Sequence, residues 1–96
     1  MNDILRVARE LDESFPWWRG LSDVRQSVLI DMGFNLGMPR LKGFRLMLAA
    51  LESGDWPEAA RQMRDSKWAA DVKTRAGRLI RMMETDEWPA EIEAAP

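Results

Sequence analysis

Acid–base chemistry in this chain would depend on Asp, Glu or Lys side chains such as Glu10 and Glu13, because the sequence contains no His, Cys or Tyr. The same composition removes disulfides, thiol nucleophiles and the imidazole ligands of most zinc and copper sites. We therefore expect no metal and no cofactor. Glu10 and Glu13 themselves fall within a segment of helical spacing, where charged side chains are usually solvated.

Tryptophan is the other residue type that could contribute to binding, since the 96 residues include five. An indole is most often part of a core, but it is also the usual platform for stacking on sugar rings or bases. We expect at least three of the five to be structural.

Charge is distributed unevenly along the chain, although the net charge is only −2. Residues 25–83 carry eleven Lys or Arg against six Asp or Glu, whereas residues 84–96 carry five acids and no base. A basic middle suits an anionic polymer such as nucleic acid or cell-wall glycan. The alternative is that these charges are the solvated faces of helices.

Helical spacing of apolar residues positions these side chains, and strand patterns are nearly absent. A first helix over residues 2–15, capped by Asn2 or Asp3, should end at Pro16. Its apolar face is predicted to comprise Leu5, Ala8, Leu11 and Phe15. Ser22 should cap a second helix that ends near Gly37. The inward residues of this second helix are predicted to be Val24, Val28, Leu29 and Met32.

The second half of the chain continues the helical pattern. A segment from Pro39 to Gly54 has an apolar stripe of Leu41, Phe44, Met47, Leu48 and Leu51. Asp55 and Glu58 have capping-box spacing before a short helix with Trp56, Ala59, Ala60 and Met63 inward. A turn-like stretch from Ser66 to Trp68 precedes a last helix over about 72–84, with Leu79, Ile80 and Met83 inward. We therefore expect an all-α bundle of about five or six helices, with Trp88 and Ile92 able to dock on it.

Two stretches of this sequence resemble a known family. The first runs from Leu21 to Gly37 and ends in Phe34-Asn35-Leu36-Gly37. The second includes Gly43-Phe44, Met47-Leu48, Gly54-Asp55-Trp56, Glu58-Ala59-Ala60, Ser66-Lys67-Trp68 and Thr74-Arg75-Ala76. In order, spacing and residue type they resemble the C-terminal helical lobe of phage-type lysozymes, the endolysins of glycoside hydrolase family 24. The resemblance extends from about residue 3 to residue 88.

This resemblance implies a domain organisation and a gap in the catalytic machinery. Residues 1–18 would correspond to the helix that joins two lobes, residues 19–93 to the C-terminal domain, and residues 94–96 to a frayed tail. In the family, the N-terminal lobe supplies a catalytic Glu, Asp and Thr. Glycoside hydrolysis needs two placed polar groups, and around Glu10 the sequence has no following glycine, hairpin or threonine. We therefore assign no catalytic residue and expect the chain to be inactive alone.

The substrate cleft is what the resemblance does carry over. It implies substrate-binding roles for Asp31, Phe34, Asn35, Leu36, Phe44, Gln62 and Trp68. Asn35 can donate and accept hydrogen bonds, as recognition of an acetamido group requires. The alternatives are that Asn35 caps a helix end with Gly37, that Trp68 and Phe44 are core residues, and that Asp31 is solvated. Met38-Pro39-Arg40 departs from the polar, Gly-rich turn of the family and would alter the rim of the cleft.

Three functions follow from these observations. The leading hypothesis is a lysozyme-related protein of the peptidoglycan-hydrolysing, cell-wall-lysis class. The second is a non-enzymatic module that binds peptidoglycan or a protein, or dimerises through residues 1–18, where a complementing catalytic lobe could also bind. Nucleic-acid binding around Arg40, Lys42 and Arg45 is the least favoured, because no helix-turn-helix motif is present and the pI is about 5.1. Without a signal peptide or an apolar span, we expect synthesis in the cytoplasm, no membrane partner, and action at the periplasmic wall after release.

Overall fold

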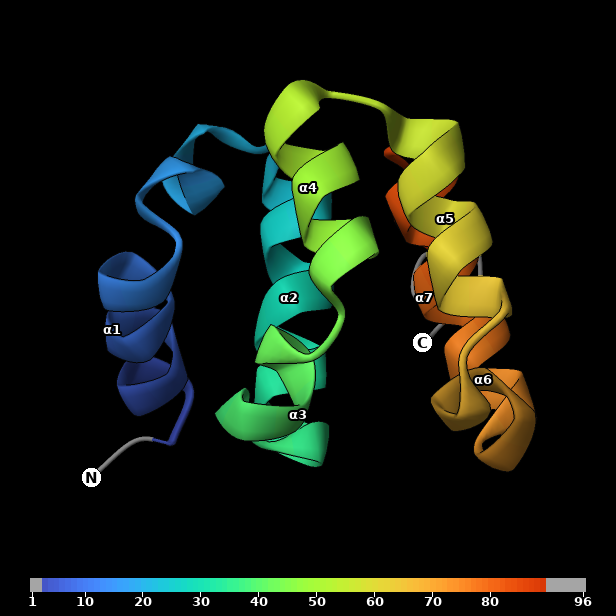
Figure 1. Cartoon of the computed structure of the whole chain (residues 1–96), viewed down its shortest axis with the longest axis horizontal. Helices are drawn as coiled ribbons and strands as arrows, with labels where there is room; N and C mark the ends of the chain where they lie inside the picture. The colour runs from blue at the N-terminus through green and yellow to red at the C-terminus, as the bar shows by residue number, and fades with distance from the viewer. Residues whose placement is uncertain (1–2, 90–96) are drawn as a thin grey trace, which may run out of the picture.

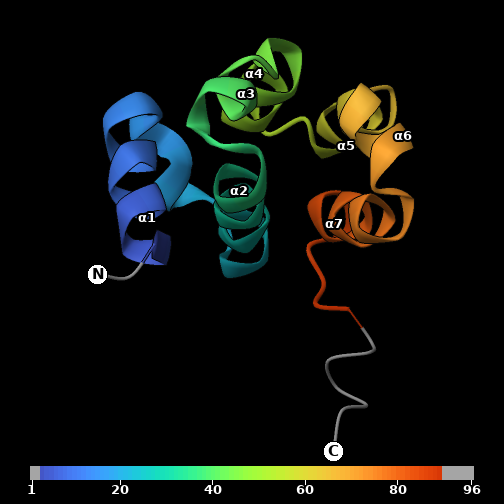
Figure 2. The same ribbon diagram turned by 90° about the horizontal axis from the view of Figure 1, so that it is seen from below.

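Helix α2 lies between α1 and α7, and α5 packs against both α4 and α7 (Figures 1 and 2). The computed structural model describes residues 3–89. Within them the elements are α1 (Asp3–Ser14), the 3-10 helix η1 (Pro16–Gly20), α2 (Asp23–Leu36), α3 (Met38–Lys42), α4 (Arg45–Ser53), α5 (Trp56–Arg64), α6 (Lys67–Asp71) and α7 (Lys73–Thr85). The predicted all-α architecture is confirmed. Asn2, Ile92, the boundary at residue 93 and the tail 94–96 lie outside the described residues.

Two short helices were not expected. The predicted segment from Pro39 to Gly54 is divided into α3 and α4, because Phe44 adopts a non-helical conformation with φ −79° and ψ 58°. Its N–H donates to the carbonyl of Leu41 at 3.0 Å, which closes the end of α3 with a tight turn. The stretch after Ser66 is helix α6, since the Ser66 hydroxyl accepts from the Ala69 N–H at 3.1 Å and caps it.

Most helix ends in the structure lie where the local sequence predicts them. Ser22 accepts from the N–H of Arg25 at 3.2 Å and caps α2, which ends at Gly37 with φ 89°. Asp55 accepts from the N–H of Glu58 at 3.3 Å. The Glu58 carboxylate does not complete the capping box, because it accepts hydrogen bonds from Arg61 and Gln62 instead. The hydrogen bond from Arg61, and to a lesser extent the one from Gln62, hold the pKa of Glu58 below its ordinary value.

The apolar face predicted for α1 is wrong at Leu5, which is 61% exposed. Val7 and Leu11 are the buried side chains, while Ala8 and Phe15 pack at the edge of the core. Val7 faces Gly33 of α2, where a Cβ atom would lie only 2.8 Å from the Val7 Cγ1. Glycine at position 33 therefore leaves the space that lets α1 pack closely on α2 through Val7.

The core confirms most of the other predicted inward residues. All four predicted for α2 are buried, as are Leu79, Ile80 and Met83 of α7. Trp18 and Trp68 are buried, whereas Trp17 and Trp56 are half-buried and pack against the core. Trp88 is exposed. At least three tryptophans are therefore structural, as expected. No helix among residues 3–89 is long and apolar enough to cross a membrane.

Asp12 fastens the end of α1 to η1. Its carboxylate accepts from the indole N–H of Trp18 at 2.7 Å and from Nε of Arg19 at 2.8 Å. Hydrogen bonding by Arg19, and then by Trp18, lowers the pKa of Asp12 to about 2. This cluster closes the turn around Pro16.

Folding stability should fall in acid because of this carboxylate. A carboxyl with a lowered folded-state pKa contributes stability above its unfolded-state pKa and loses it as pH falls through the folded value. For Asp12 that window runs from its ordinary pKa near 3.8 down to about 2. We expect Asp12→Asn to have a lower melting temperature than the wild type at pH 6, and the gap to narrow between pH 4 and pH 2. A gap that is constant over this range would contradict the assignment.

Candidate functional site

Three of the predicted substrate residues line one pocket between α2 and α7. This α2–α7 pocket has a volume of about 300 Å³ and is lined by Ile4, Ser27, Ile30, Asp31, Phe34, Asn35 and Arg75. Phe34 is 51% exposed, so its ring is available to a ligand. Arg75 of α7 lies 4.0 Å from a carboxylate oxygen of Asp31, which joins the two walls.

Asn35 is held by its own helix. Its amide nitrogen donates to the backbone carbonyl of Asp31 at 2.9 Å and to the Asp31 carboxylate at 2.8 Å. The Asn35 side chain thus bonds back to Asp31 and is not engaged in the helix cap that it was expected to form with Gly37. At that helix end the Gly37 N–H donates to the carbonyl of Gly33. Because only the amide nitrogen of Asn35 is used in these bonds, the side-chain oxygen of Asn35 is left to accept from a ligand N–H.

Three other predicted residues, Phe44, Gln62 and Trp68, meet in a second pocket of about 450 Å³ between the start of α4 and the α5–α6 corner. We call this the Phe44–Trp68 pocket, after the two rings that pack edge to face with centroids 6.2 Å apart. The remaining lining residues are Arg40, Gly43, Arg45, Leu46, Asp65, Ser66 and Lys67. Gln62 donates to Glu58 at 2.7 Å, which fixes the orientation of its amide.

Leu36 lies apart from both pockets. It is half-buried and packs against the core, as expected for the last residue of α2 before Gly37. Phe44 and Trp68 fit both the core role and the binding role considered for them, because they pack on the core and also line a pocket. Glu10 and Glu13 are on α1 and line neither pocket. Within residues 3–89, no group of three acidic, His or Cys side chains is arranged to hold a metal.

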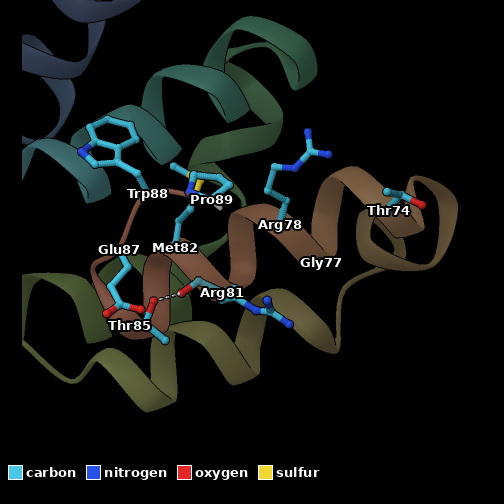
Figure 3. Close-up of a pocket in the computed structure, with 9 residues that line it drawn as sticks. All are labelled: Thr74, Gly77, Arg78, Arg81, Met82, Thr85, Glu87, Trp88 and Pro89. Carbon is cyan, nitrogen blue, oxygen red and sulfur yellow. Dashed lines mark hydrogen bonds between the residues drawn. The ribbon is translucent and has the colours of Figure 1, made fainter. Parts of the chain in front are cut away.

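A third pocket was missed by sequence reasoning. It has a volume of about 360 Å³ and lies between α7 and the segment that follows it (Figure 3). Its lining residues are Thr74, Gly77, Arg78, Arg81, Met82, Thr85, Glu87, Trp88 and Pro89. Trp88, which the sequence indicates is able to dock on the bundle, is 47% exposed and lines this pocket together with residues of α7.

Comparison with known proteins shows what the chain as a whole is similar to. Over 85 residues the chain is 32% identical to probable T4-type lysozyme 1 of Dictyostelium discoideum, an alignment that covers 84% of this chain. The chain is related to T4-type lysozymes. Probable T4-type lysozyme 2 of the same organism is 29% identical over 68 residues, 71% of this chain. No family model matches the sequence.

The relationship covers only part of each relative. The chain spans about half of T4-type lysozyme 1 and 40% of T4-type lysozyme 2. It is also 32% identical over 83 residues to the pre-baseplate central spike protein of Enterobacteria phage T4, covering 86% of this chain and 14% of that protein. The same kind of segment therefore occurs within longer proteins.

Proposed function

We propose that this chain is the substrate-binding lobe of a T4-type lysozyme fold and that it binds peptidoglycan without cleaving it alone. The observation that carries the proposal is the relationship to T4-type lysozymes over most of the chain. The pockets support it, because six of the seven predicted substrate residues line the α2–α7 pocket or the Phe44–Trp68 pocket. An open aromatic ring, amide groups and cations are suited to glycan and peptide ligands.

The acidic side chains in these two pockets do not supply the pair of groups that cleavage by this chain alone would need. Hydrolysis of a glycosidic bond needs two carboxylates, or a carboxylate and an equivalent polar group, on opposite sides of the scissile bond. Asp31 is the single carboxylate of the α2–α7 pocket, and it is engaged by Asn35. Asp65 is the single carboxylate of the other pocket, and it is paired with Arg61 at 3.3 Å.

The test measures retention of the purified chain on peptidoglycan beside the clearing of chloroform-treated Gram-negative cells. We expect retention without clearing. Phe34→Ala should weaken retention by roughly tenfold, because burial of an exposed aromatic side chain contributes about 1.5 kcal/mol or more. Leu5→Ala, a similarly exposed apolar position on α1, is the matched control and should bind as the wild type does.

The other outcomes have clear meanings. Clearing by the pure chain would show that it holds a catalytic pair. Equal loss of retention in both variants, or no retention of the wild type, would reject the binding proposal. The exposed Ile4 and Leu5 would then favour the second candidate function, a protein-binding module that uses α1. Concentration-dependent dimerisation abolished by Leu5→Ala would support that alternative.

A further inference from the structure

Three cationic side chains surround the Phe44–Trp68 pocket: Arg40, Arg45 and Lys67. All three are exposed, and within residues 3–89 their side chains have no hydrogen-bond or ion-pair partner. The pocket contains one carboxylate, Asp65, which is already paired with Arg61. The lining therefore has an excess of positive charge that the protein itself does not compensate.

This arrangement differs from that of many other cations in the fold. Arg19, Arg61 and Arg64 each lie within 2.9 Å of a carboxylate oxygen. Arg40 and Arg45 come from the two sides of the Gly43 turn, whereas Lys67 comes from the start of α6. Residues from separate elements thus bring like charges to one pocket, and their mutual repulsion would be relieved by an anionic ligand.

The largely buried Trp68 forms an apolar floor for the pocket and also carries one hydrogen-bond donor, its indole N–H. Trp68 is only 5% exposed, and its indole N–H has no hydrogen-bond partner within residues 3–89. No buried polar side-chain atom in this part of the chain lacks a partner, so the indole nitrogen of Trp68 is not fully buried and its N–H is accessible from outside the protein. The exposed Leu46 adds apolar area at the rim. A ligand that fits would combine a small apolar group with a hydrogen-bond acceptor.

From these features we infer that the Phe44–Trp68 pocket selects carboxylate-bearing ligands over neutral ones, with Arg45 and Lys67 as specificity-determining residues. The inference rests on the proposed function and deepens it, because it assigns the acidic groups of the wall polymer to this pocket. A carboxylate would accept hydrogen bonds from the guanidinium of Arg45 and pair with the ammonium of Lys67. Its apolar neighbour would contact Phe44 and Leu46, while the indole N–H of Trp68 would bind an amide or hydroxyl oxygen.

The experiment is a ligand titration of the isotope-labelled full chain, followed through the Trp68 indole N–H and the Arg45 Nε–H resonances. Two acids are compared with their neutral counterparts: N-acetylmuramic acid with N-acetylglucosamine, and alanyl-glutamate with alanyl-glutamine amide. These pairs distinguish a sugar carboxylate from a peptide carboxylate. We expect at least one acid to bind roughly fivefold more tightly than its neutral counterpart, and the preference to weaken as salt is raised.

The double variant Arg45→Gln, Lys67→Gln should abolish the preference without changing the fold, because both side chains are exposed. The control double variant Arg9→Gln, Lys73→Gln removes the same charge at exposed positions outside this pocket and should keep the preference. Equal binding of acids and neutral compounds, a preference that survives in the pocket variant, or no binding of either acid would overturn the inference.

Retention on peptidoglycan separates this inference from the proposed function. Retention on peptidoglycan with no preference for acids would reject the carboxylate selectivity of the pocket and leave the proposed peptidoglycan binding in place. A preference for acids with no retention would reject peptidoglycan binding and keep the assignment of a carboxylate site.

Discussion

Replacing Arg25 with Met lowers the free energy of unfolding by about 3 kcal/mol, the largest single effect we expect at a charged position. Arg25 is buried on α2, and its Nε donates to the carbonyl of Met83 at 2.7 Å. A second nitrogen donates to the carbonyl of Glu84 at 3.2 Å. These carbonyls belong to the end of α7, where no further turn of helix can satisfy them.

The rest of the Arg25 environment adds to this expectation. The guanidinium carbon lies 3.9 Å from the centre of the Trp56 ring, and Asp86 is 3.7 Å from a guanidinium nitrogen. Asp86 also accepts from the Ser22 hydroxyl and adopts a left-handed conformation with φ 62°. Burial lowers the pKa of Arg25, and Asp86 opposes this, but an arginine stays charged at neutral pH. One side chain therefore joins α2, α5 and the end of α7.

Urea denaturation followed by circular dichroism measures this loss. Met is unbranched and of broadly similar volume, so the change removes the hydrogen bonds and charge without opening a large cavity. The matched control is Arg64→Met, which breaks the exposed pair with Glu84 and should cost less than about 1 kcal/mol. Equal stabilities for the two variants would show that the Arg25 network contributes nothing beyond a surface ion pair.

Adding a methyl group at Gly33 should have the second-largest effect. In Gly33→Ala the new Cβ would lie 2.8 Å from Val7 Cγ1 and 3.2 Å from the sulfur of Met38. Val7 has a short, β-branched side chain, so relief requires α1 to shift away from α2. We expect a net loss of about 1–2 kcal/mol, because overpacking in the upper part of its usual range, about 2–3 kcal/mol, exceeds the gain of about 1 kcal/mol from helix propensity.

Gly77 of α7 is the matched control, because nothing lies within 4 Å of a Cβ placed there. Gly77→Ala should raise the free energy of unfolding by about 0.5–1 kcal/mol. In the Val7→Ala background, Gly33→Ala should become less costly, which a double-mutant cycle from urea titrations would detect. If both glycine variants change stability in the same direction, close packing of α1 on α2 is not what requires glycine at position 33.

The fold was predictable where the controlling interactions are local. Ser22 caps α2 through an N–H three residues away, and Gly37 ends it because a positive φ suits glycine. The break at Phe44 was missed because Leu41, Leu48 and Leu51 keep one continuous helical stripe across it. Two consecutive tight turns end α3, in which the N–H groups of Gly43 and Phe44 donate to the carbonyls of Arg40 and Leu41, each at 3.0 Å.

The sequence by itself determined that this chain is all-helical, where most helices begin and end, and which family it resembles, because caps and periodicity act over a few residues. The tertiary structure decided that Val7 and not Leu5 turns inward, where Val7 packs into the space left at Gly33 of another helix. It also decided that Arg25 is buried and that Arg40, Arg45 and Lys67 share a pocket with Trp68. These are contacts between separate elements, and their geometry follows from how the helices pack.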